Sequence, residues 1–219
     1  MKQILLMIAL VALVGCGKKS PTVEIANPIV EKAVRKEIKK PTGELTKANL
    51  ENVTELWLNR NQLTDVPKGL ENLTQLKKLY LDDNQLTDVK GLEKLTQLRE
   101  LDLSNNKLPD VKGLENLTKL TWLNLDGNQL TEVEGLEKLN QLWQLHLRNN
   151  QLTDVTGLEK LTNLQELNLN DNQLTDVKGL EKLTQLMELN LYNNPALTKA
   201  QIGQLQKALS KCFIRSDFD

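Results

Sequence analysis

The chain has 219 residues, of which 28 are Lys or Arg, 29 are Asp or Glu and one is His, so its formal net charge is −1. A nearly neutral chain lacks the concentrated basic surface that a nucleic-acid partner requires. With one His and two Cys, and none of the usual metal-ligand, nucleophile or phosphate-loop spacings, we expect a protein that is not an enzyme and that has no metal site and no cofactor.

The first sixteen residues have the pattern of a bacterial export signal. A short basic start precedes an apolar run from Ile4 to Val14, which is too short to span a bilayer because spanning takes about 20 residues. The run ends in Leu13-Val14-Gly15-Cys16, which resembles the bacterial lipobox. The resemblance implies that residues 1–15 are removed and that Cys16 is lipidated. The alternative is an ordinary signal peptide with an incidental Cys.

A lipid on Cys16 would anchor the mature chain in the cell envelope, because two or more acyl chains give stable attachment. Gly17, rather than Asp, follows the Cys, which is the pattern sent to the outer membrane if the organism is Gram-negative. We expect residues 16–26 to form a lipidated polar tether. Cys212 is then the remaining thiol, and we expect it to be a small buried hydrophobe.

Residues 27–52 are predicted to form an N-terminal helical cap. Asn27 suits the N-cap position and Pro28 the first helical position, and Pro41 lies beyond the end of the helix. One face of this helix is apolar and the opposite face is basic. Such a helix beside a lipid anchor could lie on the membrane, but we favour a cap because an uncapped array of repeats would expose its core.

Residues 53–197 contain seven copies of the pattern Leu-x-x-Leu-x-Leu-x-x-Asn-x-Leu. Successive copies start 22 residues apart, except for a first step of 23, and the twelve residues from Thr87 to Leu98 recur unchanged from Thr175 to Leu186. A repeat that cannot bury its own apolar face must stack on its neighbours. The copies begin at Val53, Leu76, Leu98, Leu120, Leu142, Leu164 and Leu186.

This pattern is the leucine-rich repeat signature, and it resembles the short repeats of the bacterial internalins. The resemblance implies an α/β fold, a right-handed horseshoe solenoid with a curved parallel sheet on its concave face and short 3-10 or irregular segments on its convex face. In each Leu-x-Leu both leucines should point inward. The Asn of each copy should satisfy the backbone of the turn rather than bind a ligand. These residues are Asn61, Asn84, Asn106, Asn128, Asn150, Asn172 and Asn194.

Residues 198–219 are predicted to form a C-terminal helical cap. Thr198 and Gln201 fit a capping box, and the apolar stripe that follows ends at Cys212. A last short strand is expected at residues 212–214, and residues 216–219 should fray.

The outward positions of the predicted strands differ from copy to copy, whereas the return segments barely change. Parallel strands lie about 4.8 Å apart, so these positions form adjacent columns across the sheet, where a ligand would make contact. The first column is Glu55, Lys78, Glu100, Trp122, Gln144, Glu166 and Glu188. The second column is Trp57, Tyr80, Asp102, Asn124, His146, Asn168 and Asn190.

Five of the seven aromatic residues are predicted at outward strand positions. Trp57 should approach Tyr80 in the same column, and Trp122 should approach Trp143 on the adjacent strand. Rings held in water on a rigid scaffold are typical interface anchors, although scattered exposed aromatics are also normal. The candidate partner-binding residues are Trp57, Tyr80, Trp122, Trp143, His146, Tyr192, Glu100, Asp102 and Asn124.

Three functions are compatible with this pattern. We favour a monomeric, envelope-anchored lipoprotein that binds a protein partner on the concave face. A glycan or peptidoglycan binder is the alternative, because aromatic rings mixed with Asn, Gln, Asp and Glu suit sugars. A passive envelope spacer is the third. The Asp residues that recur with the repeat are assigned to turns rather than to calcium.

Overall fold

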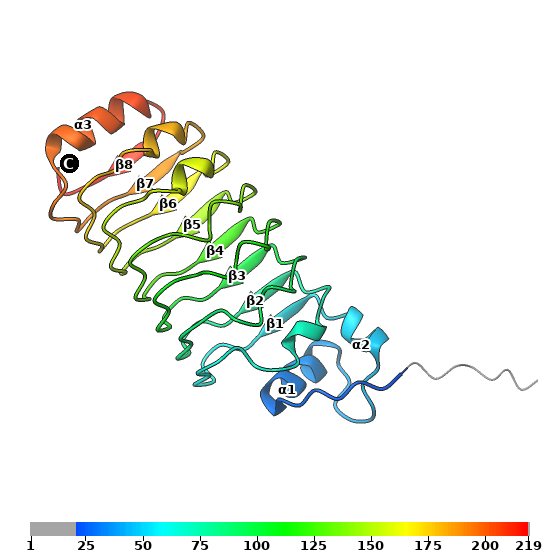
Figure 1. The fold of residues 1–219 in the computed structure, drawn as a ribbon. Coiled ribbons are helices and arrows are strands. Elements are labelled where there is room, and N and C mark those ends of the chain that lie inside the picture. The colour runs from blue at the N-terminus through cyan, green and yellow to red at the C-terminus, as the bar shows by residue number, and fades with distance from the viewer. Residues whose placement is uncertain (1–20, 219) are drawn as a thin grey trace, which may run out of the picture.

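The computed structural model describes residues 21–218 of the chain, and in this range the repeats build one eight-stranded sheet (Figure 1). Each strand pairs in parallel with the next strand in the sequence, in the order β1 to β8. This confirms the predicted solenoid. The strands are β1 (Glu55–Trp57), β2 (Lys78–Tyr80), β3 (Glu100–Asp102), β4 (Trp122–Asn124), β5 (Gln144–His146), β6 (Glu166–Asn168), β7 (Glu188–Asn190) and β8 (Phe213–Arg215).

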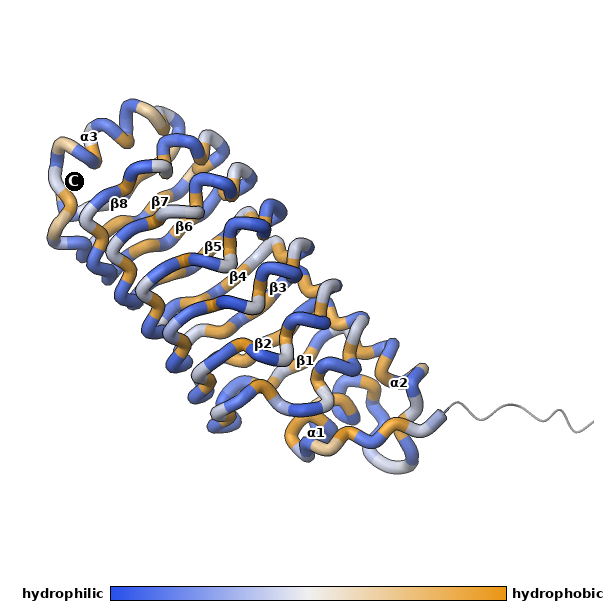
Figure 2. The backbone as a smooth tube through the Cα atoms, viewed as in Figure 1, coloured by the Kyte–Doolittle hydropathy of each residue, from blue (hydrophilic) through white to orange (hydrophobic). Residues whose placement is uncertain are grey.

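The core lies between the sheet and the return segments. Leu123 and Leu125 are both fully buried, whereas Asn124 between them is not, and the same alternation holds in every copy. Hydrophobic residues therefore recur at the same places in each coil, as the orange segments of Figure 2 show. Stacking these coils gives the continuous apolar core that a single repeat cannot form.

The return segments are tight turns with short 3-10 helices, as expected. The 3-10 helices are η1 (Leu70–Asn72), η2 (Leu158–Lys160) and η3 (Leu180–Lys182). A Gly precedes each of them with a positive φ, and Gly91, at the same position of the second copy, has φ +107°. Its N–H donates to the Glu93 carboxylate at 2.7 Å, and a Cβ there would lie 3.2 Å from Val66 Cγ1. The recurring Gly-x-Glu is thus a structural pair.

Six of the seven repeated asparagines form a buried ladder, as predicted, whereas Asn61 in the first copy is half-buried and donates to Asn59 O at 2.9 Å. The Asn106 side chain donates to the carbonyl oxygens of Leu81 and Leu103, both at 3.0 Å, and its Oδ1 accepts the N–H of Leu86 at 2.9 Å. Leu81 and Leu86 belong to the preceding copy, so each Asn joins two coils. The members with this bonding pattern are Asn84, Asn106, Asn128, Asn150, Asn172 and Asn194.

The N-terminal cap consists of α1 (Pro28–Glu37) and α2 (Lys47–Glu51). The Asn27 side chain caps α1 by accepting the N–H of Ile29 at 2.9 Å, as predicted. The apolar side of α1 covers the first coil, since Val30 and Val34 have no exposed surface. The cap interpretation of this helix is therefore confirmed.

The chain packs against this cap earlier than the sequence indicated. Thr22 forms an isolated antiparallel bridge with Thr46, the N–H of Val23 donates to Leu45 O at 2.8 Å, and Ile25 is buried. The prediction of a tether is therefore wrong for residues 22–25, because the alternating Val23 and Ile25 in this short segment supply an apolar side to the cap. Cys16 and the signal segment lie outside the described residues.

The C-terminal cap consists of α3 (Lys199–Ala208), which lies at the end of the molecule opposite α1 (Figure 1), and of β8. Thr198 and Gln201 form the predicted capping box, and the predicted last strand is present. Residue 216 does not fray, because Ser216 is buried, and the Asp217 carboxylate accepts the N–H of Asn193 at 3.1 Å. No helix within residues 21–218 is long and apolar enough to cross a membrane.

Candidate functional site

The outward residues of β1–β8 form the two predicted columns on the concave sheet face. Glu55 pairs with Lys78 and Trp57 with Tyr80, and this register continues without a slip to the last pair of strands. Strand β8 extends the columns by Phe213 and Arg215. Both residues extend the candidate site into the segment predicted as the C-terminal cap.

Trp57 and Tyr80 stack on each other at the N-terminal end of this face, as predicted. Their ring centroids are 4.0 Å apart and the ring planes differ by 17°. The Trp57 side chain is 53% exposed, so one wide apolar surface faces the solvent. Burial, together with the charge and hydrogen bond of Glu100, raises the pKa of Tyr80 to about 12, and the Tyr80 hydroxyl donates to Glu100 Oε2 at 3.2 Å.

Trp122 and Trp143 approach each other by sharing one hollow rather than by the direct ring contact that was predicted. The Trp122 ring contacts His146, with centroids 6.0 Å apart and a tilt of 50°. Trp143 lies one residue before β5 and is 43% exposed. Trp143 is one step out of register with Trp122 and stands at the end of its strand, so its ring need not turn toward Trp122.

Both indoles nevertheless line one hollow in the sheet face, of about 310 Å³. We call it the aromatic hollow. It is lined by Tyr80, Glu100, Thr121, Trp122, Trp143 and Gln144.

A second hollow lies where β3, β4 and β5 end, and sequence reasoning missed it. It has a volume of about 550 Å³, and we call it the polar hollow. It opens at Gly127, where the neighbouring copies carry Asn105 and Asn149, so the absent side chain leaves the space. In the sequence, Gly127 interrupts a column that otherwise holds Arg, Asp or Asn, and this interruption could have indicated the hollow. The lining residues are Ser104, Asn105, Asn124, Asp126, Gly127, Arg148, Asn149 and Asp171.

Asp126 is the half-buried acid of the polar hollow. Burial raises the pKa of its carboxyl group, and the backbone N–H of Arg148 and the charges of His146 and Arg148 oppose this effect. That N–H donates to Asp126 Oδ1 at 2.6 Å. The Arg148 side chain pairs with Asp171, with 2.9 Å between Nε and Oδ2.

Most charged candidates are already held by neighbours on the face. Glu100 pairs with Lys78 at 2.9 Å, and Asp102 Oδ1 accepts both the N–H and the hydroxyl of Ser104. The Asn124 amide reaches Asp102 Oδ2 at 3.4 Å. These contacts fix the side chains before any ligand arrives, which lowers the cost of ordering them on binding.

His146 lies at the centre of the face and is largely covered. Its Nε2 is 3.7 Å from Glu166 Oε1 and has no hydrogen-bond partner. The Glu166 carboxylate accepts a hydrogen bond from the Gln144 amide. His146 therefore packs against Trp122 and does not project from the face toward a partner.

Tyr192 is set apart from the other candidates. It follows β7 by two residues rather than lying in the strand, and its N–H donates to Asn170 Oδ1 at 2.9 Å. The prediction that all five aromatic residues occupy strand positions is wrong for Tyr192 and Trp143, because the strands are only three residues long.

The structure places the remaining chemical groups in structural roles. Within residues 21–218, no cluster of three His, Cys, Asp or Glu side chains could hold a metal ion. The recurring acids act in turns, since Asp88 Oδ1 accepts the N–H of Lys90 at 3.0 Å. Cys212 is buried as expected, and burial raises the pKa of its thiol to about 11.

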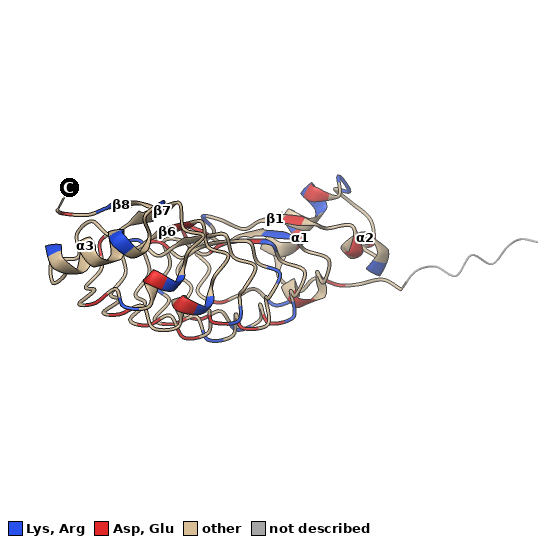
Figure 3. Cartoon of the chain, turned by 90° about the horizontal axis from the view of Figure 1, so that it is seen from above, with Lys and Arg blue, Asp and Glu red and all other residues tan. Residues whose placement is uncertain are grey.

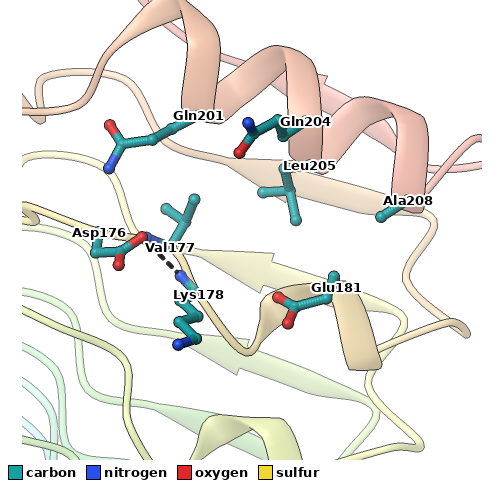
Figure 4. A pocket seen from close by; sticks show the side chains of 8 residues that line it. All are labelled: Asp176, Val177, Lys178, Glu181, Gln201, Gln204, Leu205 and Ala208. Carbon is teal, nitrogen blue, oxygen red and sulfur yellow. Dashed lines mark hydrogen bonds between the residues drawn. The ribbon is translucent and has the colours of Figure 1, made fainter.

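A further hollow of about 520 Å³ lies between α3 and the return segment of the sixth copy (Figure 4). Its apolar wall, Val177 and Leu205, belongs to the buried core. Gln201 crosses the gap and donates to Thr175 O at 3.0 Å. We assign this hollow to the seam of the cap.

Comparison with known proteins gives a family match over most of the chain. The model described as "Leucine Rich repeats (2 copies)" matches residues 51–94, 74–116, 118–160 and 162–206. No curated protein matches the chain at a significant level.

Similar solved structures include proteins of two bacteria. An internalin (inlF) from Listeria monocytogenes has a TM-score of 0.78 and 27% identity, over 86% of this chain and 55% of that one. Internalin C2 from the same organism has a TM-score of 0.69 and 29% identity, over 88% of this chain and 94% of that one.

A leucine-rich repeat protein of Leptospira interrogans has a TM-score of 0.65 and 29% identity, over 78% of this chain and 51% of that one. This chain thus spans about half the length of two of these three proteins.

Proposed function

Because the chain belongs to the leucine-rich repeat family, we propose that it is a non-catalytic module that binds a protein partner on its concave sheet face and that a lipid on Cys16 holds it in the bacterial cell envelope. The stacked Trp57–Tyr80 pair is the observation that carries the proposal. A large, rigid, exposed aromatic surface contributes binding area at little entropic cost.

The size of the face suits a protein partner. Eight strands about 4.8 Å apart give a length of roughly 34 Å. The six steps from Trp143 to Asn149, which stands at the position of Gly127 in the next copy, give a width of at most roughly 20 Å at about 3.3 Å per residue. This area approaches the roughly 800 Å² per partner of a standard interface.

The aromatic hollow adds a place for a projecting apolar side chain of the partner. Trp122 and Trp143 form its walls, and Gln144 and Glu100 offer polar groups at its rim. Interface energy concentrates at pockets that a partner's side chain fills and frees of water.

The anchor is supported by residues 1–16, whose basic start, apolar run and Cys16 resemble a lipoprotein signal. A Cys16→Ala variant should leave the membrane fraction when cells are fractionated. Retention of the variant at the parent's level would contradict lipid anchoring.

The binding surface is tested by crosslinking capture from an envelope extract, with the polypeptide that begins at Gly17. We expect one protein to be recovered by the parent and lost by a variant with Trp57, Tyr80, Trp122 and Trp143 replaced by Ala. A control replaces two exposed apolar residues outside the two columns, Met187 and Phe218, by Ala.

The control separates recognition from general stickiness. Recovery lost only with the four aromatic residues supports the proposed interface, and equal loss in both variants contradicts it. Circular dichroism of each variant establishes that it remains folded.

Glycan binding is the second candidate, and the polar hollow favours it. Amides, carboxylates and one guanidinium line this hollow within one coil of Trp122, a combination that suits hydroxyl groups and a stacked sugar ring. Binding to peptidoglycan fragments that is lost in Asp126→Asn and Trp122→Ala would support it. Capture of neither protein nor glycan would leave the passive spacer.

A further inference from the structure

The outward side of α1 carries basic residues that the fold does not use. Val30 and Val34 face the core, and the opposite side presents Lys32 and Lys36, which are exposed, and Arg35, which is half-buried. Lys39, just after the helix, is also exposed. We call Lys32, Arg35, Lys36 and Lys39 the basic patch; Figure 3 shows Lys and Arg in blue on α1.

The lysines of the patch lack compensating charges. Arg35 pairs with Glu31 at 2.8 Å, but no carboxylate within residues 21–218 lies within ion-pair distance of Lys32, Lys36 or Lys39. Three of the patch residues, Lys32, Arg35 and Lys36, line one hollow of about 390 Å³ with Pro28, Pro41 and Glu31, the carboxylate that pairs with Arg35.

Charge is distributed unevenly along the chain, with a net positive N-terminal segment and a net negative remainder. Residues 17–40 contain seven basic and three acidic residues, whereas residues 41–219 contain 20 basic and 26 acidic residues. The positive end is also the end that carries the proposed anchor. Cys16 precedes Pro21 by five residues, which reach at most about 18 Å when extended, and Pro21 O accepts the N–H of Lys47 in the cap at 3.3 Å.

We propose that the basic patch rests on the anionic phospholipid headgroups of the membrane that holds the anchor. The inference rests on the proposed lipid at Cys16 and adds an orientation to it. Because the patch and the anchor lie at the same end, the lipid and the lysines engage one surface together, and two such signals hold a protein more firmly than one. The coils then project from the membrane, and α3 lies farthest from it.

The test uses the polypeptide beginning at Gly17, which has no lipid, in flotation with vesicles of phosphatidylcholine alone or with 30 mol% phosphatidylglycerol. We expect binding to the anionic vesicles only, weakened by 0.5 M salt. Each basic residue near such a surface is worth roughly fivefold in partitioning, so replacing Lys32, Lys36 and Lys39 by Gln should lower the partition coefficient on the order of 100-fold.

The matched control replaces three exposed lysines that share one position of the repeat, Lys94, Lys138 and Lys160, by Gln. It removes the same charge far from the cap and should change partitioning by no more than about twofold. Equal binding to both kinds of vesicle, or equal loss in the two triple variants, would overturn the proposal. The result is independent of the Cys16→Ala fractionation, so failure of the anchor and failure of the patch are read separately.

Discussion

Asn124 and Asn128 lie four residues apart on the same coil, and they show how this chain separates stability from recognition. Asn128 belongs to the buried ladder, where its amide donates to the carbonyl oxygens of Leu103 and Leu125, both at 3.0 Å. Asn124 lies on the concave sheet face, where its amide N–H reaches one carboxylate at 3.4 Å and its Oδ1 accepts the N–H of Asp126, within its own coil, at 3.0 Å. Hydrogen bonds to the backbone of two coils therefore require Asn at the ladder position, whereas the residue type at the face position can vary.

The same division runs through the whole molecule. Asn recurs at the position of Asn128 in all seven copies, and the return segment keeps Gly-x-Glu in six. The outward columns change from Trp57 to Asn190 without disturbing the strand register. A scaffold that tolerates any outward residue can evolve a binding face at little cost in stability.

The largest expected effect is loss of a ladder residue. Asn128→Ala leaves the buried N–H of Leu108 without a partner, which costs about 1 to 3 kcal/mol. The carbonyl groups of Leu103 and Leu125 each lose one of two hydrogen bonds, since Asn106 and Asn150 still donate to them. We expect a loss of about 3 kcal/mol in urea unfolding followed by circular dichroism. Asn124→Ala is the matched control and should cost less than about 1 kcal/mol. Similar losses in the two variants would contradict the division.

A glycine of the return segment should come next. Gly91 has φ +107°, which a side chain rarely adopts, and a Cβ would press on Val66 Cγ1 at 3.2 Å. Gly91→Ala should therefore cost about 2 kcal/mol, with the strand register unchanged. An unfolding midpoint equal to that of the parent would show that the turn relaxes freely.

Tyr80 offers a pH-dependent test of the sheet face. Its pKa is raised from 10.0 to about 12, chiefly by burial and then by Glu100, so the folded chain favours the neutral phenol. The associated stability is complete below about pH 10 and is lost as the pH rises toward about 12. Tyr80→Phe should remove this part of the pH dependence, as measured by urea midpoints at pH 9 and pH 11.5. Parallel curves for parent and variant would argue against a raised pKa.

The period of the sequence was sufficient for the fold, because a spacing of 22 residues leaves one way to stack the coils. It also placed the columns correctly, since side chains alternate with period two along a strand. The stacking of Trp57 on Tyr80 follows directly from that register.

Other contacts depend on where each side chain turns, which the period does not determine. Trp122 meets His146 instead of Trp143 because Trp122 pairs with Gln144, and His146, two residues farther along β5, points to the same face at the diagonal position. The docking of Val23 and Ile25 and the capping box of α2, made by Thr46 and Asn49, lie outside the repeat, where no second copy reveals the pattern. The usual signature of that box has Glu or Gln in the place of Asn49.

Gly127 gives the smallest expected change in stability and the sharpest map of the interface. Its φ of +65° is one that Asn tolerates, and Asn105 and Asn149 occupy the same position in the adjacent copies with φ of +53° and +54°. Gly127→Asn should cost less than about 1 kcal/mol, after the Asn105 side chain moves away from the new Cβ, which would otherwise lie 2.5 Å from its Oδ1. The new amide fills the polar hollow and leaves Trp57 and Tyr80 untouched. Titrating the captured partner against parent and variant then locates the contact: weaker binding places the partner across both hollows, and unchanged affinity confines it to the aromatic side of the face.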